Sequence, residues 1–269
     1  MRKNTLKLAT LILGYAFLYI PIFTLIVFSF NSSKQVVVWA GFSLKWYGEL
    51  FENTELLNAA WISLRIAFMC ATFSVILGTL SALILVKFKR FRGKNLFQTL
   101  IMAPLVMPEI ITGLAFLLLF VNMERLIGWP ASGGITALTI AHTTLAMAYV
   151  TSIVYSQLVN FDDILIEAAM DLGASPLKSF FAITLPIITP SLVAGWLLSF
   201  VLSLDDVVIS SFVAGPQSTT LPMVVYSSVK YGLTPQINAL ATIIISFIAL
   251  CIIIAAILHA RHQKMVNQN

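Results

Sequence analysis

Charged side chains are scarce in this sequence. Only 10% of its 269 residues are charged and 59% are hydrophobic, which gives a mean hydropathy of +0.95. An average soluble domain has about 25% charged residues, so this composition excludes that class. The chain is therefore predicted to lie in a lipid bilayer.

Cysteine and the usual signatures of catalysis are scarce as well. Cys70 and Cys251 have no CxxC spacing and no neighbouring histidine, so neither a disulfide framework nor a metal site is predicted. The Gly93-Lys94 pair lacks the earlier glycine and the Ser/Thr of a phosphate-binding loop. His142 is isolated in an apolar segment, where a hydrogen-bonded structural role is expected. We therefore expect no catalytic residue, metal or cofactor in this chain.

Long apolar runs make up most of the chain. A helix needs roughly 20 apolar residues to cross about 30 Å of hydrocarbon. Six segments reach that length, at residues 8–30, 64–86, 96–121, 136–159, 187–212 and 237–258. The first is longer than the apolar region of a signal peptide and lacks an A-x-A-like cleavage site. The sequence thus predicts an all-α membrane protein with six transmembrane helices in a single domain, residues 1–269.

Basic residues are distributed unevenly between the two sets of links and termini. One set carries Arg2, Lys3, Lys7, Lys87, Lys89, Arg90, Arg92, Lys94, Lys178, Arg261 and Lys264. The opposite set carries only Lys34, Lys45, Arg125 and Lys230. By the positive-inside rule the first set is cytoplasmic, so both termini are expected in the cytoplasm. The net charge of +5 then reflects membrane orientation, and no nucleic acid is expected as a partner.

A more polar cytoplasmic segment, residues 160–186, separates the fourth and fifth apolar runs. A short helix is expected at 163–172, with one apolar stripe formed by Ile164, Ala168 and Leu172. Gly173 stands where a helix C-terminal cap is expected, and Ser175 followed by Pro176 is typical of the start of a second helix. The segment is thus predicted to form a rigid helix, turn and helix on the cytoplasmic surface.

Three carboxylates lie inside predicted spans, where charge is costly and marks functional positions. At 1.5 Å per residue, Asp205 lies roughly 27 Å from the cytoplasmic end of the fifth span and Glu109 roughly 20 Å along the third. Asp206 follows Asp205, and Arg65 is the available opposing charge. Adjacent acids point about 100° apart on a helix, so one arginine satisfies both poorly. A cation pathway is favoured; the alternative is that one aspartate pairs with Arg65 or caps a helix break.

Two further side chains fit a cation pathway. Ser203 offers a hydroxyl oxygen close to the acids, and Trp46 lies in the first external loop. The indole ring can supply a cation–π contact worth about 0.5–2 kcal/mol. An ordinary anchor at the membrane interface is an equal alternative for Trp46.

The spacing within the cytoplasmic segment is specific. EAA at 167–169, glycine at 173 and I-x-LP at 183–186 match the signature EAA-x3-G-x9-I-x-LP. On these residues the chain resembles the permease subunits of ABC importers, and the resemblance covers nearly its whole length. It implies the type I importer fold and a coupling helix that docks on a separate ATPase subunit through Glu167, Ala168, Ala169 and Gly173. A local role in the first turn of the helix is the alternative for Glu167.

Three other stretches, PLVMPEIITG, SLDDVVISSFVAGP and KWYGELF, are similar to the polyamine branch of this family and most similar to putrescine permease subunits. This likeness implies a substrate pathway that includes Trp46, Glu109, Ser203, Asp205 and Asp206. It also implies a place in the bacterial inner membrane and three kinds of partner: a second homologous permease, two copies of an ATPase subunit that hold ATP and Mg²⁺, and a periplasmic polyamine-binding protein. No residue in the sequence measures the spacing of amines, so putrescine and spermidine both stay open.

Two alternatives to polyamine import stay open. An ABC importer for another small solute would keep the coupling segment and change the cargo. An ion-coupled secondary transporter would use the carboxylates as proton sites. Such transporters usually have internal repeats, and none is recognisable in this sequence.

Overall fold

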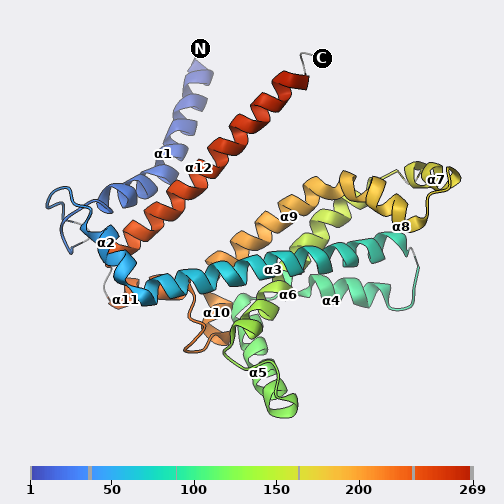
Figure 1. The fold of residues 1–269 in the computed structure, drawn as a ribbon, viewed down its shortest axis with the longest axis horizontal. Coiled ribbons are helices and arrows are strands. Elements are labelled where there is room, and N and C mark those ends of the chain that lie inside the picture. The colour runs from blue at the N-terminus through green and yellow to red at the C-terminus, as the bar shows by residue number, and fades with distance from the viewer. Residues whose placement is uncertain (1, 36–37, 89, 163, 232–233, 267–269) are drawn as a thin grey trace. The chain divides into compact units, whose positions relative to one another are not determined.

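The protein is described here by a computed structural model. It describes residues 2–35, 38–88, 90–162, 164–231 and 234–266, and their side chains except those of 2–6, 231 and 251–266. The described chain is helical, with two isolated β-bridges in place of strands (Figure 1). It divides into two compact units, residues 1–57 with 227–269, and residues 58–226. The prediction of a single domain stays a prediction.

The first unit contains α1 (Arg2–Phe28), α2 (Lys45–Glu52) and α12 (Pro235–Val266), and both α1 and α2 contact α12. Two side-chain hydrogen bonds tie α2 to the start of α12. Asn53 Nδ2 donates to Gln236 Oε1 at 2.7 Å, and Gln236 Nε2 donates to Glu49 Oε2 at 3.3 Å. Most of the described apolar side chains of α1 are exposed, as expected for a helix that faces lipid.

The second unit is built around α6 (Ile135–Val159), which contacts α9 (Leu185–Asp205) and α4 (Lys94–Val106). Glycines let neighbouring helices approach α6 closely. A Cβ at Gly78 of α3 (Thr54–Lys87) would lie 2.8 Å from Val150, and one at Gly195 of α9 would lie 3.4 Å from it. Small residues at contacts of this kind are the usual way that membrane helices pack.

The third and fifth predicted spans are each divided by a break in the helix. The chain is extended at Met107 and Pro108, between α4 and α5 (Glu109–Ile127). Pro108 has no N–H to continue the helix, whereas Pro104 remains inside α4. The second break follows Asp205 and separates α9 from α10 (Val208–Val213). The predicted third and fifth spans, 96–121 and 187–212, thus each contain two helices.

Five helical stretches are long and apolar enough to cross a membrane within the described residues: Lys7–Phe28, Thr54–Lys87, Glu109–Ile127, Ile135–Val159 and Pro176–Asp205. The last comprises α8 (Pro176–Ser179), a π-helical turn (Phe180–Thr184) and α9. The sixth predicted span, 237–258, falls within α12, and its side chains from residue 251 onward lie outside the described set. The remaining helices are α7 (Ile164–Asp171) and α11 (Leu221–Tyr231).

Candidate functional site

Asp206 closes the break between α9 and α10. Its Oδ2 accepts a hydrogen bond from the Ser210 backbone N–H at 2.7 Å, and its Oδ1 accepts one from Ile209 at 3.3 Å. The carboxylate thereby satisfies two of the donors that the first turn of α10 leaves free. Its side chain is only 9% exposed, and His142 Nε2 lies 3.3 Å from Oδ2. Of the expected alternatives, Asp206 therefore caps a helix break, with His142 rather than Arg65 as its side-chain partner.

His142 joins these residues to a second hydroxyl. Its Nδ1 lies 2.7 Å from Ser203 Oγ, and its Nε2 lies 3.3 Å from Ser210 Oγ. The prediction of a hydrogen-bonded histidine is confirmed. Its partners were missed because they lie 61 to 68 residues away along the chain, where spacing gives no signal. Of the predicted pathway residues, Ser203 and Asp206 are thus brought together through His142.

Asp205 and Glu109, in contrast, are exposed. Neither carboxylate has a hydrogen bond or ion pair with the side chain of another residue in the described part of the chain. Each stands at a helix break, and the two breaks belong to helices that pack together. A Cβ at Gly113, one turn after Glu109, would lie 2.7 Å from Phe212 and 3.4 Å from the Cα of Ile209. The second unit therefore presents two free carboxylates at neighbouring helix breaks.

Helices α5 and α10 also end at a common junction. Gly133, in the turn after α5, forms a parallel bridge with Ala214, the residue after α10. The Ser218 hydroxyl donates to Gly133 O at 2.6 Å. Contacts near both ends of α10 thus fix how α5 and α10 lie against each other.

Trp46 belongs to the first unit and is 3% exposed. Its indole N–H donates to the Asn31 carbonyl at 2.5 Å. The expected type of cation–π contact is present, but its cation is the neighbouring Lys45, whose Nζ lies 5.0 Å from the ring centroid. These contacts give Trp46 a structural role within its unit, and its place in a substrate pathway stays a prediction.

Residues 160–186 contain the predicted helix, turn and helix. Gly173 has a φ of +86°, which favours glycine, and the Ala174 N–H donates to Ala169 O at 3.0 Å to close the end of α7. Ser175 Oγ accepts from the Lys178 backbone N–H at 3.3 Å, and Pro176 is the first residue of α8. The first helix was expected at 163–172 and lies at Ile164–Asp171.

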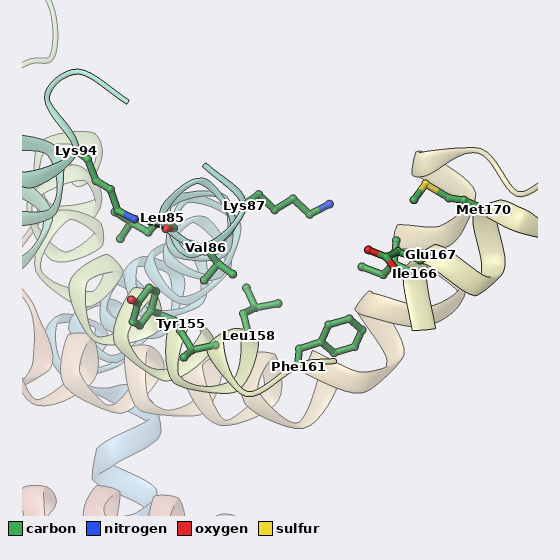
Figure 2. A pocket seen from close by; sticks show the side chains of 11 residues that line it. Leu85, Val86, Lys87, Lys94, Tyr155, Leu158, Phe161, Ile166, Glu167 and Met170 are labelled. Carbon is green, nitrogen blue, oxygen red and sulfur yellow. Dashed lines mark hydrogen bonds between the residues drawn. The ribbon is translucent and has the colours of Figure 1, made fainter. Parts of the chain in front are cut away.

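Two faces of α7 differ in their surroundings. The ends of the predicted apolar stripe are exposed, Ile164 at 65% and Leu172 at 91%. The opposite side borders a cavity of about 570 Å³. Figure 2 shows Glu167 pointing into this cavity from α7, and Lys87 extending toward it from the end of α3. The helix α7 therefore has an exposed apolar outer face, and its side toward the cavity carries one acid, Glu167, between Ile166 and Met170.

Long apolar helices, with breaks at carboxylates before α5 and after α9, are features of a membrane protein that has polar groups within the bilayer. The comparison with known families agrees. Residues 74–268 match the family described as "Binding-protein-dependent transport system inner membrane component", and the chain belongs to this family. It is accordingly an inner-membrane transport component.

Two curated relatives from Escherichia coli strain K12 match nearly the whole chain. "Putrescine transport system permease protein PotI" is 53% identical over 262 residues, covering 97% of this chain and 93% of the relative. "Spermidine/putrescine transport system permease protein PotC" is 44% identical over 253 residues, covering 94% of this chain and 93% of the relative.

Solved structures support the same fold. A chain of a bacterial ABC transporter that imports the acidic polysaccharide alginate has a TM-score of 0.73 at 18% identity, covering 96% of this chain and 94% of that one. A chain of the MetNI methionine ABC transporter has a TM-score of 0.58 at 18% identity, covering 74% and 92%. These likenesses place the fold among ABC importer permeases.

Proposed function

We propose that this chain is a permease subunit of an ATP-driven polyamine importer, with putrescine as a cargo. The observation that carries the proposal is the pair of exposed, unpaired carboxylates, Glu109 and Asp205, at adjacent helix breaks. The names of PotI and PotC, which include putrescine and spermidine, support the choice of cargo.

The chemistry of the two carboxylates suits a linear amine. Each ammonium end of a polyamine donates hydrogen bonds and carries a positive charge, and hydrogen bonds to charged groups are worth about 1.5–3 kcal/mol. An acidic cargo would be repelled by the same pair. Ser203 and Asp206 support the break behind these acids, and Trp46 remains the proposed aromatic contributor.

The proposed assembly follows the family. Six spans would leave both termini in the cytoplasm, and a second permease would complete the pathway. Two ATPase copies would hold ATP and Mg²⁺, and a periplasmic binding protein would deliver the amine. The exposed side chains of Ile164 and Leu172 support docking of α7 in a groove of the ATPase. ATP-driven closure of the ATPase pair would then move α7 and switch the bundle between outward-open and inward-open states.

Substitution of the two free acids tests the proposal. Asp205→Asn and Glu109→Gln each keep the size of the side chain and remove its charge. We expect initial putrescine uptake to fall about tenfold or more in each, from the loss of one charged hydrogen bond. Glu55→Gln, which removes an exposed acid at the start of α3, is the matched control and should transport normally. Normal uptake by both test variants would overturn the cation pathway.

Two further measurements separate this proposal from its rivals. Competition between labelled putrescine and unlabelled spermidine ranks the two amines as cargo. If the transporter takes up neither amine, another cargo is favoured. Gentle purification of the tagged chain should bring down an ATPase subunit. Uptake that persists without ATP, and without a co-purifying ATPase, would favour an ion-coupled transporter.

A further inference from the structure

His142 connects both sides of the break in the fifth predicted span. Its side chain is 2% exposed, and both ring nitrogens have partners. Nδ1 contacts the Ser203 hydroxyl of α9 at 2.7 Å. Nε2 lies 3.3 Å from Asp206 Oδ2, and also 3.3 Å from the Ser210 hydroxyl of α10. One side chain of α6 therefore holds the end of α9, the break itself and the first turn of α10.

The orientation of the His142 ring depends on these hydrogen-bond partners, because the rest of its surroundings are apolar. A cavity of about 10 Å³ beside it is lined by His142, Ser203 and Asp206, and otherwise by the apolar residues Leu145, Ala146, Leu202 and Ile209. A space of this size holds one water at most, so it cannot admit an amine cargo. A polar ring buried among apolar side chains is stable only when its hydrogen bonds are made. The His142 imidazole and the Asp206 carboxylate therefore hold each other in position.

The two neighbouring aspartates are thereby given different surroundings. Asp206 accepts from two backbone N–H groups and contacts His142, which leaves it little capacity for a cargo. Asp205 is exposed and has no such partner within the described residues. Because consecutive side chains point in different directions, holding Asp206 inward holds Asp205 outward.

We propose that His142 is a positioning residue of the transport pathway, which fixes Asp206 in the break between α9 and α10 and so presents Asp205 to the amine. This inference rests on the proposed import of polyamines. It assigns the binding of the ammonium group to Asp205 and the maintenance of the break to Asp206 and His142.

Uptake kinetics of the full transporter, reconstituted in liposomes with its partner subunits, test this assignment. In His142→Ala we expect the KM for putrescine to rise about tenfold, the factor that one hydrogen bond to a charged group is worth, with a smaller change in Vmax. His142→Gln keeps a donor and an acceptor and should restore most of the affinity. Thr144→Val is the matched control, because the Thr144 hydroxyl donates to Ile140 O of its own helix at 2.8 Å and bonds to no other helix among the described residues.

Double variants distinguish positioning from general packing. If His142 acts through Asp205, His142→Ala should add almost nothing to the KM of Asp205→Asn. In the Glu109→Gln background, His142→Ala should still raise the KM by its full factor, since effects at independent sites multiply. Should His142→Ala fail to assemble, Asp206→Asn takes its place, and its effect on KM should likewise disappear in the Asp205→Asn background.

Three outcomes are decisive. An unchanged KM in assembled His142→Ala transporter would overturn the positioning role, and so would an equal rise in KM with and without Asp205. A wild-type transporter that takes up no polyamine would instead refute the proposed function.

Discussion

At the scale of single residues, a substitution of Trp46 tests whether its indole ring is a structural anchor or a contact to the cargo. Trp46→Phe keeps an aromatic face and removes the N–H that bonds to the Asn31 carbonyl. Because a buried acceptor loses its donor, we expect a loss of about 1–3 kcal/mol of stability. The thermal unfolding midpoint of the purified complex should fall by a few degrees, whereas the KM for putrescine should change little.

A matched control for this prediction lies in the same unit. Trp39 is 49% exposed and packs edge-to-face on Phe28, so Trp39→Phe should leave the midpoint unchanged. A raised KM in Trp46→Phe without any loss of stability would show that the indole N–H serves the cargo.

The acidic residues of the site could be predicted from the sequence, but which of them is buried and which is exposed could not. Intramembrane charge is conspicuous in any apolar run, so Glu109, Asp205 and Asp206 are visible as candidates. Which aspartate is buried depends on His142, and that partner is distant in sequence. Only the packing of α6 against α9 and α10 brings them together.

At the scale of helices, the turn between α7 and α8 depends on Gly173. An alanine there would adopt a φ of +86° at a cost of about 1–2 kcal/mol, although the space around the position is open. We expect Gly173→Ala to loosen this turn and to lower the amount of putrescine moved per ATP hydrolysed, measured in liposomes.

Gly14→Ala provides the control for that experiment. Gly14 lies inside α1, has open space around it and no positive φ. Alanine is favoured over glycine in a helix, so transport per ATP should be unchanged. An equal effect of both substitutions would mean that the geometry of the turn is not what couples ATP to transport.

The inner face of α7 gives a second test at this scale. Lys87 and Glu167 extend toward one another across the cavity beside α7 (Figure 2). Both side chains are exposed, and such pairs are worth about 0–1 kcal/mol. If Glu167 serves chiefly to contact the ATPase, Glu167→Gln should lower uptake severalfold and Lys87→Gln should not. Equal losses of uptake in the two variants would indicate that Glu167 acts together with Lys87 of its own chain.

Helices were easier to predict than their interruptions. Length and hydropathy indicated each apolar run, and Gly173 with Ser175-Pro176 correctly marked the turn between α7 and α8. Proline marked the break at residue 108, because its ring removes a donor. No proline or glycine accompanies the break after Asp205, which depends on the capping contacts of Asp206.

At the scale of the whole molecule, the orientation of the chain in the membrane can be tested. In a background with Cys70 and Cys251 replaced by alanine, single cysteines are placed at Lys34 and Ser175, both exposed. With both termini in the cytoplasm, a membrane-impermeant maleimide should label the Lys34→Cys variant in cells with a permeable outer membrane. The Ser175→Cys variant should react only after the inner membrane is opened, and earlier labelling would contradict the proposed orientation.

Composition and one spaced signature were sufficient to predict the family, which the match over residues 74–268 shows. They could not predict that the chain divides into two compact units, because that division depends on contacts between its ends, 1–57 and 227–269. Hydropathy measures transfer into lipid and carries no information on which helices pack together.

The close approach at Gly113 has a consequence for selectivity. No side chain in the sequence fixes the spacing of amine groups, and the Glu109 and Asp205 carboxylates lie at the breaks that precede α5 and α10, two helices that approach closely at Gly113. A methyl group at residue 113 would lie 2.7 Å from the Phe212 ring, so either this ring or the two helices would have to shift. If these two carboxylates bind the two ammonium ends of a diamine, as proposed above, the missing side chain at Gly113 helps to set the distance that the diamine spans.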